Sequence, residues 1–226
     1  TDDLFIGGDA TTTGDNFTVG SVNIPGGTTA IGGAVRISRG VNRTGTLTQT
    51  GGALQVDELI QVGGGSNTAG LRSVSNYTLA GGLLELGVSG GAAGTILKDN
   101  HADATVTLSG GTMRTTTAGQ DLAWINQAGT NANQDITSGA VIDMRGGRLQ
   151  GNNSIDDYNI TGGELRNAAE VGHIGGDAAA LADMIDLNVS GGLVRPSEDG
   201  TARAMALRAS GGTGLGEYIP SGGTFL

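Results

Sequence analysis

The chain has 226 residues, of which 44 are Gly, 3 are Pro and none is Cys, and its formal net charge is −10. Glycine is roughly three times as frequent as in a typical protein, but it follows no every-third-residue period and proline is scarce, which excludes a collagen helix. The lack of Cys excludes disulfides and thiolate metal sites, no apolar run is long enough for a membrane-spanning helix, and the negative charge argues against nucleic acid as a partner.

The chain begins at Thr1 rather than Met, and no basic region followed by an apolar stretch precedes that residue. This is expected of a protein whose leader has been removed, and equally of a segment of a longer protein. Aromatic residues make up 3% of the chain, so the core is thin and aliphatic. A thin core favours an elongated fold, which is typical of repeat proteins.

One phrase recurs along the whole chain: alternating apolar and polar residues, a Gly-Gly pair, a spacer and another apolar residue. Its copies lie at 47–54, 77–84, 106–113, 142–149, 158–165 and 187–194, with weaker copies around the glycine pairs 26–27, 211–212 and 222–223. Alternation is the period of a strand, so each copy predicts a strand, a corner and a second strand. Glycine at the corner permits a positive φ and a close approach of neighbouring backbones.

The spacing of these corners indicates a solenoid. The first glycines of successive pairs lie at 26, 51, 81, 110, 146, 162, 191, 211 and 222. The commonest step is about thirty residues, which is the length of one solenoid coil.

A second phrase, an apolar residue followed by Gly-Gly and a polar loop, falls between copies of the first. It occurs at 6–10, 31–34, 62–65 and 174–178. Each coil is thus predicted to have a fixed corner and a variable corner, with surface loops at 9–18, 65–75, 90–104, 126–137 and 177–186. Residues 178–187 carry apolar side chains at helical spacing and fit one short helix.

These patterns predict an all-β fold, a parallel β-helix (β-solenoid) of about eight coils, with the right-handed sense that such coils usually have. Residues 1–226 are expected to form a single domain with incomplete terminal coils. Successive strands pair at about 4.8 Å, which makes the rod roughly 40 Å long. Because one coil cannot bury its own apolar face, each coil depends on its neighbours and the terminal coils are the weakest.

The chain resembles the glycine-rich extracellular β-strand repeat proteins of bacteria, the autotransporter-associated and sorting-signal-associated repeats that abound in planctomycetes and verrucomicrobia. The resemblance rests on phrases such as Thr-Leu-Ser-Gly-Gly-Thr at 107–112, followed by an apolar Gly-Gly loop, and it covers nearly all of residues 4–226. It implies a secreted or cell-surface β-solenoid without family-wide catalytic residues.

The two ends of the sequence look like complementary half-coils. Placed tail before head, they match the pattern of the internal coil at 51–63, and neither end carries an evident polar cap. We therefore hypothesise that the chain stacks head to tail as a homopolymer, which makes it the structural subunit of an extracellular filament or surface layer. The residues expected at the assembly interface are Leu4, Phe5, Ile6, Thr224, Phe225 and Leu226. The same half-coils are expected in a segment cut from a longer repeat array.

Two other functions are weighed against assembly. An adhesin stalk or carbohydrate-binding rod would grip surface glycans through loops 65–75 or 90–104. A polysaccharide-degrading β-helix enzyme would need carboxylates grouped on one face. The acidic pairs lie at 2–3, 57–58 and 156–157, and adjacent strand residues point to opposite faces, so no catalytic residue and no enzymatic activity are predicted.

No cofactor is expected, with calcium as the alternative. Asp99, His101 and Asp103 stand at alternate positions, from which an extended loop can direct all three side chains at one ion. The stretch lacks the glycine and glutamate positions of an EF-hand loop, so a solvated loop is the better interpretation.

Six Asn-x-Ser/Thr triplets are candidate glycosylation sites. Their asparagines are Asn16, Asn42, Asn76, Asn152, Asn159 and Asn188. Glycans at these positions require a surface location in a secreted protein.

Overall fold

The computed structural model describes residues 3–8, 17–64, 73–87, 94–98, 102–126, 134–137, 139–151, 157–173, 186–197, 205–208, 218–220 and 224–226. Every regular element in these ranges is a β-strand, and the strands form two sheets, called sheet A and sheet B below. The predicted all-β class is therefore confirmed.

Sheet A has eight strands, in the spatial order β1 (Leu4–Ile6), β4 (Val35–Ile37), β6 (Leu59–Val62), β8 (Gly94–Lys98), β10 (Leu122–Asn126), β13 (Arg148–Gly151), β16 (Glu170–His173) and β19 (Ala206–Arg208). Sheet B has 13 strands, which are β2 (Thr18–Ile24), β3 (Thr28–Ile31), β5 (Arg43–Val56), β7 (Ser73–Leu86), β9 (Ala102–Thr115), β11 (Gln134–Ile136), β12 (Ala140–Asp143), β14 (Asp157–Ile160), β15 (Glu164–Arg166), β17 (Asp186–Val189), β18 (Leu193–Arg195), β20 (Tyr218–Pro220) and β21 (Thr224–Phe225).

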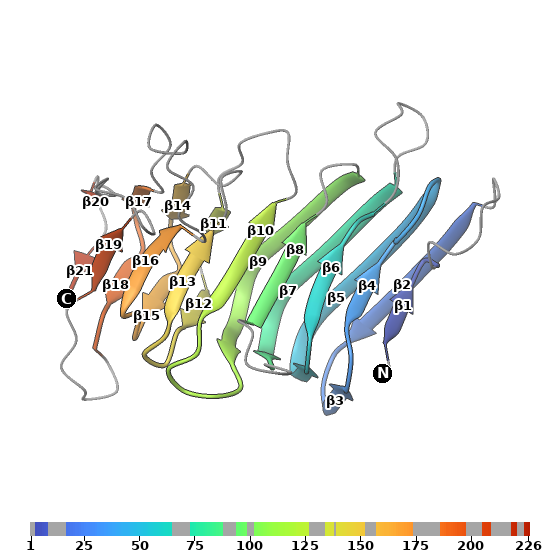
Figure 1. Ribbon diagram of the computed structural model, residues 1–226, viewed down its shortest axis with the longest axis horizontal. Helices are drawn as coiled ribbons and strands as arrows, with labels where there is room; N and C mark the ends of the chain where they lie inside the picture. Colours follow the sequence, from blue (N-terminus) through green and yellow to red (C-terminus); the bar gives the residue numbers. More distant parts are fainter. Residues whose placement is uncertain are drawn as a thin grey trace.

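All strand pairs are parallel, and each pair joins equivalent strands of successive turns. Leu47, for example, is the register partner of Tyr77, and Tyr77 is the partner of Val106. The turns follow one another along the long axis of the molecule, from the blue N-terminal end to the red C-terminal end (Figure 1). The predicted parallel β-solenoid is confirmed.

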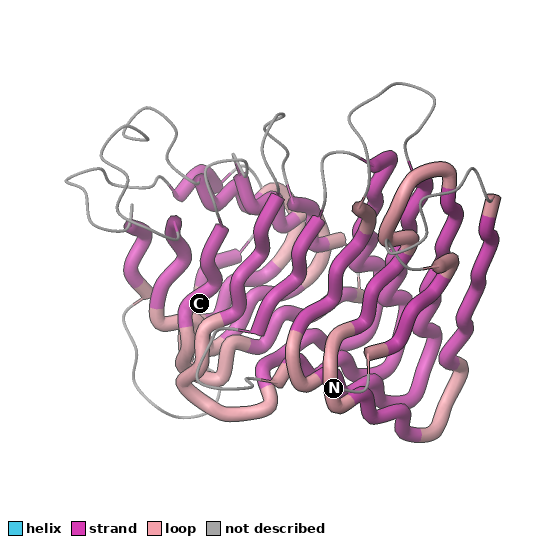
Figure 2. Tube along the Cα trace, turned by 45° about the vertical axis from the view of Figure 1, so that its right-hand side comes forward, coloured by secondary structure: helices cyan, strands magenta, loops and turns pink. Residues whose placement is uncertain are grey.

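The turns are not described equally well along the chain. About four turns, from β2 to β10, are described over most of their length, fewer than the eight coils that the spacing predicts. The later turns are described as shorter strand segments that continue the same ladders. Figure 2 shows the turns one behind another in a second view. The right-handed sense of the coil stays a prediction.

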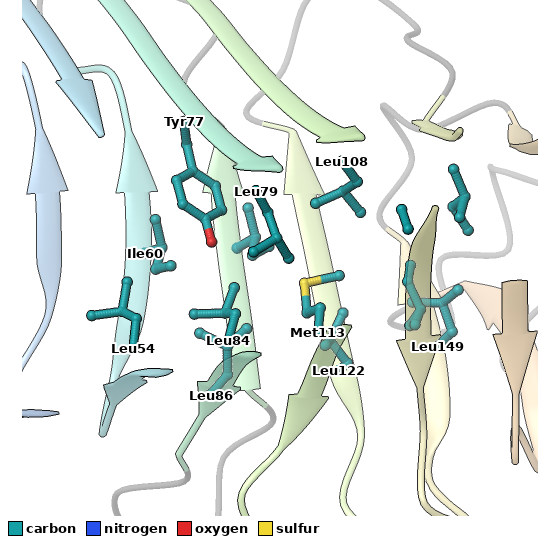
Figure 3. Close-up of a cluster of buried hydrophobic side chains, with 14 of the residues drawn as sticks. Leu54, Ile60, Tyr77, Leu79, Leu84, Leu86, Leu108, Met113, Leu122 and Leu149 are labelled. Carbon is teal, nitrogen blue, oxygen red and sulfur yellow. The ribbon is translucent and has the colours of Figure 1, made fainter. Parts of the chain in front are cut away.

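The core is a set of apolar ladders between the two sheets. In sheet B, register partners in six successive turns are fully buried: Leu54, Leu84, Met113, Ile142, Leu165 and Val194. Sheet A contributes Val35, Ile60 and Ile96, which are also register partners and also fully buried. Several of these side chains meet in Figure 3. Alternation along each strand therefore puts the Val, Leu and Ile of the repeat inside, as the sequence predicts.

The fixed corner lies within sheet B, where the glycine pair bends the strand. The second glycine of the pair has a positive φ in successive turns, with values of 64° at Gly52, 80° at Gly82 and 71° at Gly111. A Cβ at Gly52 would stand 2.5 Å from the carbonyl oxygen of Gly27 in the preceding turn. Both predicted reasons for glycine, the left-handed backbone and the close approach, are thus confirmed at this corner.

One predicted copy of the corner is wrong. Gly146 and Gly147 lie between β12 and β13, where the chain leaves sheet B for sheet A. The fixed corner of that turn lies between β11 and β12, where Gly139 has a φ of 85°. The copy at 142–149 matches the pattern because both kinds of corner place Gly-Gly after an apolar strand.

The predicted variable loops coincide largely with parts of the chain outside the described residues. The same holds for nearly all of the predicted helix at 178–187, of which the residues from Asp186 onward belong to β17. Within the described residues, no helix is long and apolar enough to span a bilayer.

Candidate assembly surfaces

The two ends of the stack consist of strands that pair on one side among the described residues. At the N-terminal end, β1 pairs with β4, while β2 and β3 pair with β5. At the C-terminal end, β19, β20 and β21 pair with β16, β17 and β18. These two end surfaces lie at opposite ends of the molecule (Figure 1). An unpaired strand edge is a template for another strand.

At the N-terminal end, the backbone of Phe5 faces away from the stack. The amide of Leu4 donates to the carbonyl oxygen of Ala34 at 2.9 Å, and the amide of Ser38 donates to the carbonyl oxygen of Ile6 at 2.7 Å. Backbone groups alternate in direction along a parallel strand. The N–H and C=O of Phe5, which lies between Leu4 and Ile6, therefore point outward.

The β3 edge presents the same kind of groups. The amide of Ala53 donates to the carbonyl oxygen of Gly27 at 2.8 Å, and the amide of Asp57 donates to that of Ile31 at 3.0 Å. By the same alternation, the N–H and C=O groups of Thr28 and Ala30 point away from β5.

At the C-terminal end, Phe225 has the outward backbone groups. The amide of Thr224 donates to the carbonyl oxygen of Gly192, and the amide of Leu226 donates to that of Val194, both at 3.0 Å. Phe225 lies between these two residues, so its N–H and C=O face away from β18. Each end surface thus offers both donors and acceptors.

Apolar side chains are uncovered at the first turn. Leu4, Val22 and Ile31 are half-buried and pack against the core. Their register partners in the second turn, Val35, Leu47 and Val56, are all 0% exposed. The positions are equivalent, so the difference in exposure shows what a preceding turn would cover.

Most of the exposed large apolar side chains lie on the end turns. Among the described residues, five such side chains are exposed, and four of them are Phe5 at 40%, Phe17 at 83%, Val19 at 78% and Leu226 at 69%. Phe17 and Val19 are not among the interface residues that the sequence predicts. Their position could have singled them out, because Val19 lies on β2 and Phe17 directly precedes that strand of the first turn.

Asp3 fixes the first strand to the second turn. Its carboxylate accepts hydrogen bonds from the amide of Ala34 and from Nε of Arg36, both at 2.9 Å. The Ala34 hydrogen bond and then that of Arg36 hold the pKa of Asp3 below its usual range. Arg36 also donates to Oε1 of Gln61 at 2.7 Å, which continues the contact into a third turn.

The predicted interface residues occupy these end surfaces. In β1, Leu4 is half-buried, Phe5 is exposed and Ile6 is 2% exposed. At the other end, Thr224 and Leu226 are exposed. Ile6 therefore belongs to the core of the first turn, while its neighbours reach the surface.

The predicted metal and glycosylation residues are scattered. Asp99, His101, Asn16 and Asn152 lie outside the described residues. Asp103 belongs to β9 as the register partner of Val74, and no group of three potential metal ligands occurs in the described part of the chain.

Three of the remaining asparagines lie on strands. Asn76 alternates with buried residues on β7 and so faces outward, while Asn159 and Asn188 are register partners on β14 and β17. Asn42 lies at a corner with a φ of 54°. Asn76 therefore has the outward placement that a glycan requires.

Comparison of the chain with protein families, with curated proteins and with solved structures found no match.

Proposed function

We propose that this protein is the structural subunit of an extracellular filament or surface layer, assembled by head-to-tail stacking of solenoid ends. The observation that carries the proposal is the pair of open end surfaces, with outward backbone groups at Phe5 and Phe225 and half-buried core residues at the first turn. A second copy that stacks on the first turn would pair these groups and cover this apolar surface.

The contact is heterologous, because the N-terminal surface of one copy meets the C-terminal surface of the next. Each added copy presents a new free surface, so the assembly grows as an open fibre unless the rotation closes a ring. The acidic net charge of −10 keeps finished rods apart laterally. Polymer growth along one axis is the expected outcome.

Substitution of Phe5 by Pro tests the proposal at the strand edge. Proline removes the outward N–H, which costs about 0.5–1.5 kcal/mol for the lost hydrogen bond and more where a carbonyl oxygen is left without a partner. We expect the critical concentration for assembly, measured by sedimentation and negative-stain microscopy, to rise roughly tenfold.

The matched control is Phe5→Ala, which keeps the amide and removes a side chain on the outer face of the strand. It should assemble nearly as the natural protein does. A purified natural chain that stayed monomeric at high concentration, with both end turns ordered, would contradict the proposal.

The outer face of sheet B favours a second candidate function, that of an adhesin or carbohydrate-binding rod. On the outer face of sheet B, Thr48, Thr78 and Thr107 are register partners in three successive turns, and Asn76 lies in the adjacent row. These side chains are uncharged and partly or fully exposed. Rows of hydroxyl and amide groups at a strand spacing of about 4.8 Å suit a repetitive polyhydroxylated surface. Co-sedimentation of the protein with insoluble polysaccharides tests this candidate.

A further inference from the structure

The corners of successive turns stack so closely that a methyl group does not fit between them. A Cβ at Gly51 would overlap the carbonyl oxygen of Pro25, one at Gly81 would overlap that of Thr50, and one at Gly110 would overlap that of Ala80. In each case the obstructing atom belongs to the backbone of the preceding turn. The first glycine of the corner is thus a direct reporter of whether a turn lies in front of it.

The corner of the first turn carries the same Gly-Gly pair, but no described residue packs against it from the N-terminal side. A Cβ built on Gly26 meets nothing within 4 Å, and neither does one built on Gly27. Gly27 has a φ of 72°, close to the values at its equivalents, while Gly26 has no positive φ. The backbone is therefore shaped for stacking, but the position that a preceding turn would occupy is open.

We propose that this corner receives the last turn of a second copy of this chain, in the register that continues the ladders of the stack. This proposal rests on the proposed function and specifies the contact between two successive copies, called the joint below. β20 and β21 of one copy lie beside β2 and β3 of the next, so that Tyr218 is the partner of Val22 and Thr224 is the partner of Thr28.

The spacing across the corner supports this register. From Val22 to Thr28 the offset is 28 − 22 = 6 residues, and from Tyr218 to Thr224 it is 224 − 218 = 6 residues. The ladder of Thr28 runs through every turn to Thr224. The ladder of Val22 runs through β5 and β7 to β9, and that of Tyr218 runs back through β17 and β14 to β11, which itself pairs with β9. Because the offsets are equal, both strand segments of the last turn can pair with the first turn at once.

In this register the outward N–H and C=O groups of the two edges lie opposite each other. In this register the N–H of Phe225 meets the C=O of Thr28, and the N–H of Ala30 meets the C=O of Phe225. These are the outward groups found at the two ends. A shift by one residue would place outward groups of one edge against inward groups of the other.

Gly26→Ala tests the joint without disturbing the fold of a single copy. It introduces neither backbone strain nor a clash within one copy, so its thermal unfolding should match that of the natural protein. At the equivalent positions Gly51, Gly81 and Gly110 a methyl group would overlap the backbone of the preceding turn, so the methyl group of Gly26→Ala is expected to obstruct a copy that stacks in the same way. We expect the fibres seen for the natural protein to be lost at the same concentration.

Gly32→Ala is the matched control. A Cβ at Gly32 also meets nothing within 4 Å, and the equivalent position in the next turn is Asp57, whose side chain the stack accepts. This variant should assemble normally. Normal assembly of Gly26→Ala would overturn the joint but leave the proposed function standing, whereas a natural protein that forms no polymer would overturn both.

Cysteine cross-linking tests the register directly, because the natural chain has no Cys. A mixture of Thr28→Cys and Thr224→Cys copies should form cross-linked dimers on mild oxidation or with a short bifunctional reagent, and Ala30→Cys with Thr224→Cys should do so much less. Thr28 and Thr224 are both exposed. Efficient cross-linking of Thr28→Cys copies with one another would indicate a head-to-head contact and overturn the proposal.

Discussion

Replacement of Gly82 by Ala separates the two reasons for glycine at the corner. Gly82 has a φ of 80°, and a Cβ at this position would overlap the backbone of Gly51 and Gly52 in the preceding turn. The left-handed backbone costs an alanine about 1–2 kcal/mol. Forcing extra volume into a packed site costs about 1–3 kcal/mol more. Gly82→Ala should therefore lose about 2–5 kcal/mol of unfolding free energy.

Gly119→Ala provides the control for the backbone cost alone. Gly119 has a φ of 79°, and a Cβ there meets nothing within 4 Å. The expected loss is about 1–2 kcal/mol. Denaturant unfolding followed by far-UV circular dichroism measures both variants, at concentrations below that of assembly. Equal losses for the two variants would refute the claim that stacked corners exclude a methyl group.

Two further predictions concern the lateral surface. The carboxylate of Glu85 accepts hydrogen bonds from Gln55 and from Arg114, which hold the pKa of Glu85 below the usual range. The ionised carboxylate therefore stabilises the fold above the ordinary glutamate pKa, and this stabilisation is lost as the pH falls through the lowered pKa. Glu85→Gln should thus be less stable than the natural protein at neutral pH, and its denaturation midpoint should change less between about pH 5 and pH 3; a midpoint with unchanged acid dependence would contradict this. If the hydroxyl face binds polysaccharide, Thr78→Lys should reduce co-sedimentation without changing assembly, and unchanged co-sedimentation would count against that face.

The sequence predicted the fold because the repeat encodes it locally. Alternation places Leu47 and Gln49 inside before the glycine pair at 51–52, and Leu54 and Val56 inside after it. Leu47 and Leu54 are an odd number of residues apart, so the bend at the glycine pair brings both to the core. The thirty-residue period then pairs each turn with the next, as the partners Leu47 and Tyr77 show. Each of these signals is contained within one or two copies of the repeat.

The sequence was less informative where different corners share a pattern. Gly146 and Gly147 follow an apolar strand and resemble the fixed corner, but they join sheet B to sheet A. The fixed corner of that turn uses Gly139, which is not part of a glycine pair. Only the register of β12 with β9, through partners such as Ile142 and Met113, identifies which corner is which.

Exposure at the ends could not be predicted from the residues alone. Val22 and Leu47 occupy equivalent positions and are both apolar, yet the first is half-buried and the second is 0% exposed. The difference comes from the turn in front, which is a property of the stack and not of the strand. The same holds for Gly26 and Gly51, whose surroundings differ although their local sequence is similar.

This dependence on neighbours couples folding to assembly. In a stack of repeats, stability is approximately a sum of the contributions of the turns and of the interfaces between them. Among the described residues no turn lies in front of the first one, where Leu4, Val22 and Ile31 are only partly buried. A second copy that supplies the missing interface would bury these side chains and satisfy the outward groups of Phe5. The end turns should therefore become more resistant to unfolding as protein concentration rises, while central turns such as those of β9 and β12 should not change.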